Sequence, residues 1–167
     1  LSYVRTISDD FRATKRLPLL HIETHGFVDG IGPASGQEIL WPDLMQELIP
    51  LNRLTQLRLI VVLAACEGLW GLQMAQPVER AAFLALLGPN ERISAAKLAA
   101  ACQTFYRSIF KDRNGDAAFK AMNDVVDPTK LTFGMVNAEM LFKHVYRLFL
   151  KKSRNEEEVS KRVEWVV

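Results

Sequence analysis

The stretch LRLIVVLAACEG, residues 57–68, decides the fold class of this chain. It is rich in β-branched residues and almost continuously apolar through Ala65, which is typical of a strand buried on both faces of a parallel sheet. A helical pattern, WPDLMQELIPLNRL over residues 41–54, comes before it, and the compact apolar run LPLLHIE over residues 17–23 comes before that helix. Strand, helix and strand in this order predict a βαβ unit.

The rest of the chain extends this pattern. The glycine-broken stretch FVDGIGPASGQEILW, residues 27–41, predicts a β-hairpin or loop, and a short polar helix is expected over residues 8–16. Further along we expect a loop through Pro77, a strand over 81–87 ended by Gly88, Pro89 and Asn90, and helices over Ser94–Phe110, 116–126 and 138–152. These elements predict an α/β sandwich.

Composition describes an ordinary globular domain. The chain has 167 residues, 49% of them hydrophobic and 24% charged, and a formal net charge of +2, which is too small to indicate a nucleic-acid-binding face.

Its two cysteines, Cys66 and Cys102, form no disulfide framework, and we see no signal peptide or membrane-length apolar run. We therefore expect a cytoplasmic protein that binds neither nucleic acid nor membrane. The chain does not begin with methionine, which predicts a piece of a longer protein.

His25 and Cys66 follow two of the predicted strands. In open α/β sheets, functional groups collect beyond the carboxyl ends of the strands, and neighbouring strands lie about 4.8 Å apart. A thiol is mostly protonated at neutral pH, and an adjacent imidazole removes its proton during attack. Gly26 and Gly68 leave room for a substrate backbone, and the amides of Gly26 and Cys66 are candidate donors to an oxyanion. The sequence predicts a thiol acyl-transfer site.

Two sequence blocks carry a family resemblance. HIETHG, residues 21–26, followed by IVVLAACEG, residues 60–68, resembles the His-Gly and Ala-Cys-Glu/Arg-Gly blocks of caspase-like cysteine peptidases, and the CHAT family in particular. The glycine-broken hairpin after the histidine resembles that family too, as does LQMAQPVERAAFLALLGPNERISAAKLAAACQTFYRSIF, residues 72–110. The resemblance covers roughly residues 17–126. The family's opening strand and helix have no counterpart before residue 17.

The resemblance implies a caspase-like three-layer α/β/α sandwich with a mainly parallel central sheet. We place this domain at residues 17–152, after a lead-in of residues 1–16 and before a charged tail or helix extension of residues 153–167. The implied activity is that of a cysteine endopeptidase in bacterial defence or regulated cell death, with no cofactor. His25 would act as the base, Cys66 as the nucleophile, and the Gly26 and Cys66 amides as the oxyanion hole. Its expected partners are a protein substrate and a regulatory or sensor domain or subunit.

Three acids near the proposed site, Glu23, Asp29 and Glu67, are candidates for substrate binding, without a defined pocket among them. They weakly favour a basic residue before the cleaved bond. The alternative function is a non-catalytic interaction module that keeps the same fold.

A metal site is not expected. His21, Glu23 and His25 alternate along an extended segment, but His21 and His25 would stand about 13 Å apart, which is too far for two ligands of one ion. Cys102 lies on the apolar stripe of its predicted helix, so we expect it to pack in the core.

Overall fold

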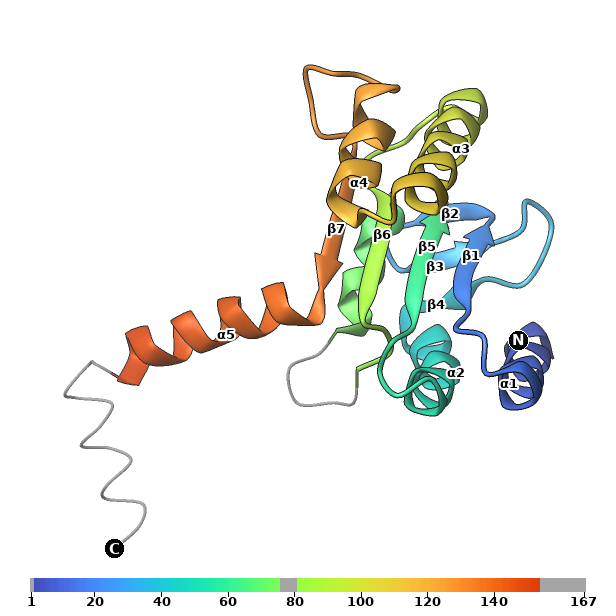
Figure 1. Cartoon of the computed structure of the whole chain (residues 1–167), viewed down its shortest axis with the longest axis vertical. Helices are drawn as coiled ribbons and strands as arrows, with labels where there is room; N and C mark the ends of the chain where they lie inside the picture. Colours follow the sequence, from blue (N-terminus) through green and yellow to red (C-terminus); the bar gives the residue numbers. More distant parts are fainter. Residues whose placement is uncertain (1, 76–80, 154–167) are drawn as a thin grey trace, which may run out of the picture.

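The computed structural model describes residues 2–75 and 81–153, which form a mixed α/β structure with two sheets (Figure 1). The main sheet contains β1 (Leu19–Glu23), β5 (Ile60–Ala64), β6 (Ala85–Pro89) and β7 (Phe133–Asn137). The second sheet contains β2 (His25–Phe27), β3 (Gly30–Gly32) and β4 (Ile39–Leu40). The helices are α1 (Ser2–Thr14), α2 (Trp41–Leu54), α3 (Ala95–Asp112), α4 (Gly115–Asp124), α5 (Ala138–Ser153) and the 3-10 helix η1 (Gly68–Met74).

The main sheet is mostly parallel, as the sequence predicted. Its strand order is β1-β5-β6-β7, with β1, β5 and β6 parallel and β7 antiparallel to β6. The segment β1-α2-β5 is the predicted βαβ unit, and its register pairs Leu19 with Ile60 and Glu23 with Ala64. This register places the residues that follow β1 beside the residues that follow β5.

Helices cover both faces of the main sheet, and β5 contributes to both cores. Val61 and Leu63 belong to a cluster with residues of α2 and η1, whereas Val62 and Ala64 belong to a cluster with residues of α3 and α4. Side chains alternate between the faces of a strand, so a strand that is apolar at every position needs an apolar layer on each side. This explains the continuous apolar run of β5.

Most of the predicted elements are confirmed, with differences at their ends. The strand over 17–23 and the helix over 41–54 correspond to β1 and α2, and the glycine-broken stretch forms the second sheet. Ser94 caps α3 as predicted, because its hydroxyl accepts a hydrogen bond from the amide of Lys97. α1 starts at Ser2, earlier than expected. The tail beyond residue 153 and the segment around Pro77 lie outside the described residues.

Two predictions after β5 were wrong. The expected loop after Cys66 contains η1, and the strand expected over 81–87 begins at Ala85 and continues through Pro89. Gly88 does not end this strand: a Cβ at that position would lie 2.8 Å from the carbonyl carbon of Gly68. The glycine is needed because η1 packs directly on β6.

Strand β7 was not predicted at all. Its sequence, FGMVN, is short and contains a glycine, so it lacks the apolar run of a central strand. It forms at the edge of the sheet by pairing with β6, Pro89 opposite Phe133 and Ala85 opposite Asn137.

Two buried asparagines hold the starts of strands. Asn52 in α2 accepts a hydrogen bond from the amide of Leu59, just before β5, at 3.0 Å, and donates one to the carbonyl of Ala81 at 2.8 Å. Asn123 in α4 accepts one from the amide of Phe133, the first residue of β7, at 2.7 Å. Each side chain thereby satisfies buried backbone groups where regular pairing does not reach them.

Helix α5 leaves the body of the molecule after β7 (Figure 1). Several of its apolar side chains are exposed, with Phe142 at 68% and Tyr146 at 50%, and these two rings stack on each other. No helix within the described ranges is both long enough and apolar enough to cross a membrane.

Replacing Asn123 with leucine should lower the free energy of unfolding by roughly 1–3 kcal/mol, because the Phe133 amide would stay buried without an acceptor. Urea unfolding followed by circular dichroism measures this change. The matched control is Asp124→Ala in the same helix, whose side chain is exposed, and it should change stability by about 0.5 kcal/mol or less. Equal losses in the two variants would contradict this role of Asn123.

Candidate active site

The candidate site lies beyond the carboxyl ends of β1 and β5. Thr24 connects the main sheet to the second sheet: its amide donates to the carbonyl of Ala64 at 3.4 Å, and its hydroxyl donates to the carbonyl of Gly32 at 2.7 Å. His25, the next residue, begins β2 and pairs with Gly32. The segment that carries the histidine is therefore attached to the end of β5.

The β2–β3 hairpin is held on its far side by α2 and η1. The carbonyl of Val28, in the turn of the hairpin, accepts hydrogen bonds from Trp41 Nε1 at 2.7 Å and from Gln73 Nε2 at 2.9 Å. The amide of Trp41 also donates to the carbonyl of Asp29 at 3.0 Å. With contacts at both ends, the hairpin fixes the backbone position of His25, whose side chain is exposed.

Cys66 occupies a sharp turn between β5 and η1. Glu67 has a φ of 57°, in the left-handed region, and its amide donates to the carbonyl of Glu91 at 3.1 Å. The amide of Gly68 donates back to the carbonyl of Ala65 at 3.0 Å. The chain therefore reverses directly after the cysteine, which leaves the Cys66 side chain half-buried at the edge of the sheet.

Gly26 lies directly against Cys66. A Cβ placed on Gly26 would lie 2.0 Å from the carbonyl oxygen of Cys66 and 3.0 Å from the Cβ of Ala65. Only a residue without a side chain allows the two backbones to come this close. The structure thus brings the predicted histidine segment and the predicted cysteine together, as the sequence spacing suggested.

The side chains of His25 and Cys66 are not hydrogen-bonded to each other. The Cys66 thiol donates to the carbonyl of Ile93 at 3.6 Å, in the loop between β6 and α3. Within residues 2–75 and 81–153, the His25 imidazole has no hydrogen bond or ion pair, and the Cys66 amide has no acceptor. The His25 imidazole and the thiol and amide of Cys66 therefore belong to two backbone segments that touch at Gly26. Among the described residues, neither the imidazole nor the amide has a hydrogen-bond partner.

The three candidate acids lie in different places. Asp29 is exposed in the hairpin turn, and the Glu67 carboxylate is 4.0 Å from Arg92. Glu23 is on β1, where its carboxylate is 3.9 Å from His21. The structure does not gather these three side chains into one pocket.

His21 and Glu23 share one face of β1, as their alternation predicted, but His25 belongs to the second sheet. His21 Nδ1 shares a hydrogen bond of 2.6 Å with the hydroxyl of Tyr106 in α3. In the ranges that the structure describes, no group of three His, Cys, Asp or Glu side chains is arranged to hold a metal ion.

Cys102 is buried under the main sheet, in the cluster around α3 and α4. Burial, with a smaller effect from the Glu23 carboxylate, raises the pKa of its thiol to about 11. A thiol with such a pKa is almost entirely protonated at neutral pH and is a poor nucleophile. Its position agrees with the packing role predicted for it.

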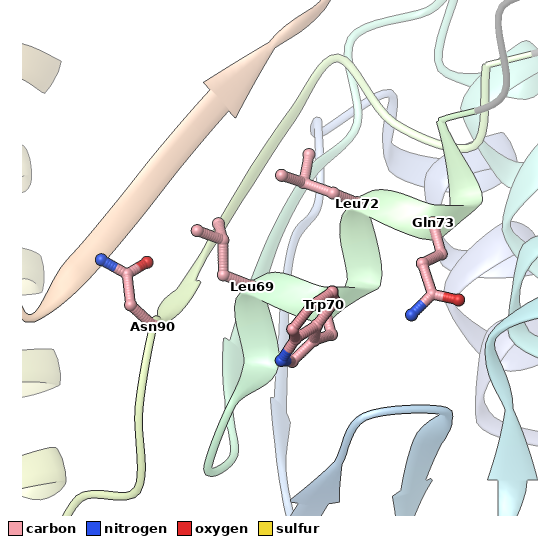
Figure 2. A pocket seen from close by; sticks show the side chains of 5 residues that line it. All are labelled: Leu69, Trp70, Leu72, Gln73 and Asn90. Carbon is pink, nitrogen blue, oxygen red and sulfur yellow. The ribbon is translucent and has the colours of Figure 1, made fainter.

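An apolar pocket of about 580 Å³ opens beside η1, the helix that follows Cys66 (Figure 2). Leu69, Trp70, Leu72 and Gln73 line it from η1, and Asn90 lines it from the end of β6. Trp70 is 48% exposed there. Gln73 is also the residue that holds the hairpin turn, so the pocket wall and the hairpin are directly connected.

Sequence reasoning missed the loop between β6 and α3 as a part of this site. Ile93 accepts the thiol hydrogen bond, and Glu91 accepts the amide of Glu67. The loop follows the third parallel strand, so the rule that loops gather at the carboxyl edge was a signal for it. Thr24 and Gln73 carried no such signal, because their contacts depend on the exact path of the hairpin.

The chain matches no family model, and no curated protein matches it either.

Replacing Gly26 with alanine should destabilise the fold by about 1–3 kcal/mol, because the added methyl group overlaps the Cys66 backbone, which cannot rotate away. Thermal unfolding measures the effect. Gly115→Ala is the matched control: a Cβ at Gly115, the first residue of α4, meets nothing within 4 Å, so this variant should gain about 0.4–1 kcal/mol. A Gly26→Ala protein as stable as the wild type would contradict the close approach.

The two cysteines should differ in reactivity. At pH 8, iodoacetamide should alkylate the half-buried Cys66 well before the buried Cys102. Labelling of Cys102 should rise about tenfold per pH unit between pH 8 and 10, since its thiolate fraction rises towards its pKa of about 11. Peptide mass spectrometry reads both sites, and urea-unfolded protein, in which both should react alike, is the control. Equal native rates would contradict the burial of Cys102.

Proposed function

We propose that this chain is a caspase-like cysteine endopeptidase domain of the CHAT type, in which Cys66 is the nucleophile and His25 the base. The observation that carries the proposal is the backbone contact between Gly26 and Cys66, which leaves no room for a side chain on Gly26. It joins the histidine segment to the cysteine at the carboxyl edge of a mostly parallel sheet, where α/β enzymes hold their reactive groups. The substrate in this proposal is a protein of the same cellular compartment, the cytoplasm.

The reaction follows from the groups at this edge. The Cys66 thiol gives its proton to the His25 imidazole, and the sulfur attacks the carbonyl carbon of the peptide bond. The oxygen of the tetrahedral intermediate accepts hydrogen bonds from the amides of Gly26 and Cys66. The intermediate then breaks its C–N bond, and the imidazolium protonates the leaving amine. Water hydrolyses the resulting thioester, which releases the carboxylic acid and restores the thiol.

One local change precedes the attack. In this mechanism the thiol that donates to the Ile93 carbonyl leaves that acceptor and turns towards the imidazole. The present geometry corresponds to a resting state. A bound peptide, or the regulatory partner expected from the family resemblance, would favour the other rotamer.

The second candidate is a non-catalytic interaction module. The observation that favours it is α5, on which the exposed rings of Phe142 and Tyr146 share one face and stack on each other without a covering element among the described residues. In this case Cys66 and His25 would be structural residues of a fold that is kept for assembly.

The two candidates differ in the behaviour of Cys66→Ala and His25→Ala. If the chain is a peptidase, each variant should lose at least a thousandfold of the cleavage rate on a synthetic peptide library read by mass spectrometry. Cys102→Ala, which removes the other thiol, should keep the wild-type rate. Circular dichroism checks that all three variants stay folded.

A peptidyl acyloxymethyl ketone gives a second readout, because it labels a nucleophilic thiol without needing the natural substrate. It should label the wild type and Cys102→Ala but not Cys66→Ala. Cleavage that persists in Cys66→Ala would disprove the assignment, and labelling of Cys102 alone would favour the interaction module.

A further inference from the structure

Helix α5 projects from the body of the molecule and follows directly on β7 (Figure 1). Its start is fixed, because the amide of Ala138 donates to the carbonyl of Leu84 at 2.9 Å and the amide of Met140 donates to the Asn137 side chain at 2.8 Å. Beyond this start, the described side chains through Lys151 are exposed, apart from Leu141, which is half-buried. The body thus holds one end of the helix and leaves the rest open.

One side of α5 is apolar and rich in aromatic rings. Residues three, four and seven positions apart share a helix face. This spacing places five apolar residues on one side: Leu141, Phe142, Tyr146, Leu148 and Phe149. Phe142 is 68% exposed and Tyr146 is 50% exposed, and their rings stack with an angle of 7° between them. An exposed apolar face of this kind marks a contact with another apolar phase.

The opposite side of α5 is basic. Lys143, Arg147 and Lys151 follow one another at intervals of four residues and form a stripe along the helix. Glu139 is the single acid in the sequence between Ala138 and Lys151, and its carboxylate is 2.6 Å from Lys143. Within the described ranges, Arg147 and Lys151 form no ion pair. Two cations therefore remain for an external anion, on the same helix as the exposed rings.

We propose that α5 binds to an anionic phospholipid surface. The helix lies in the plane of the bilayer, with its apolar side among the acyl chains and its basic stripe at the lipid phosphates. A groove on another protein would need only the apolar side, whereas an anionic bilayer takes up both sides of the helix. Lysine and arginine side chains are long enough to reach the headgroups from a helix whose other side is immersed. The charge of the stripe thus selects a lipid surface over a protein groove.

Binding at α5 goes beyond both candidate functions and depends on neither. The sequence predicted no membrane partner, because it holds no apolar run of membrane-spanning length. A helix that lies on a bilayer needs no such run, since only one of its sides leaves water. The sequence indicated a helix over residues 138–152, whereas the exposure of its apolar side depends on where β7 directs it.

Co-sedimentation of the full chain with lipid vesicles tests this binding. The chain should bind vesicles of phosphatidylcholine with about 30% phosphatidylserine, and roughly tenfold more weakly vesicles of phosphatidylcholine alone. Added NaCl should weaken the binding to the anionic vesicles, because exposed cations are screened. It should not abolish the binding, because the contact of the rings with the acyl chains remains.

Variants of α5 locate the binding. Arg147→Gln and Lys151→Gln should each weaken it about fivefold, since each removes one cation from the surface. Phe142→Ala should weaken it about tenfold, because it removes a ring from the acyl region. Glu139→Gln should strengthen it, because Lys143 loses its acidic partner. All four side chains are exposed, so circular dichroism should show an unchanged fold.

Helix α3 offers matched controls. Phe110→Ala removes a ring that is 74% exposed, and Lys111→Gln removes an exposed cation, both from a helix that packs on the main sheet. These two variants should bind vesicles as the wild type does. Cys66→Ala should bind vesicles normally too, whether or not the chain is a peptidase.

Three results would overturn the proposal. The first is equal binding to the two kinds of vesicle, and the second is wild-type binding by Phe142→Ala or by Arg147→Gln. The third is a dimer in sedimentation velocity that Phe142→Ala dissociates, in a chain that ignores vesicles. That last result would assign the apolar side of α5 to a second copy of the chain.

Discussion

The parallel pairing of β1 with β5 is the constraint on which the rest of the structure depends. Its register, Glu23 opposite Ala64, sets the two chain segments side by side as they leave the sheet. Gly26 therefore lies in direct contact with the backbone of Cys66. A slip of one residue would turn every side chain of β1 to the other face and would separate these two segments. The apolar layers on both sides of β5 resist such a slip.

The sequence was sufficient where one strong physical signal acted alone. The apolar run of β5 and the Ser94 cap of α3 needed no tertiary information, and both were predicted correctly. The approach of Gly26 to the backbone of Cys66 followed from the rule that parallel strands end together. Strand β7 could not be predicted, because its start depends on a hydrogen bond from Phe133 to Asn123, ten positions away and in another element. Gly88 was read as a strand end, whereas it records the close packing of η1.

The orientation of the two candidate catalytic side chains was also beyond the sequence. Spacing predicts where backbones meet, but the hydrogen bond of the Cys66 thiol to the Ile93 carbonyl depends on the path of the loop after β6 and on a side-chain rotamer. The contacts that position the His25 segment come from Trp41, which the sequence assigned only to a helix, and from Gln73, which it assigned to a loop. A site made of loops on a rigid sheet is predictable in its location and much less so in its geometry.

Ile93 belongs to two neighbouring features of the structure. Its carbonyl accepts the hydrogen bond of the Cys66 thiol, while the residue itself lines a polar pocket of about 300 Å³ at the start of α3. A displacement of this loop would move the acceptor of the Cys66 thiol, and thermodynamic coupling of that kind is reciprocal. Chemistry at the sulfur that removes its hydrogen bond to Ile93 would leave this carbonyl without that donor. Oxidation or acylation of Cys66 should therefore change the conformation of the loop between β6 and α3.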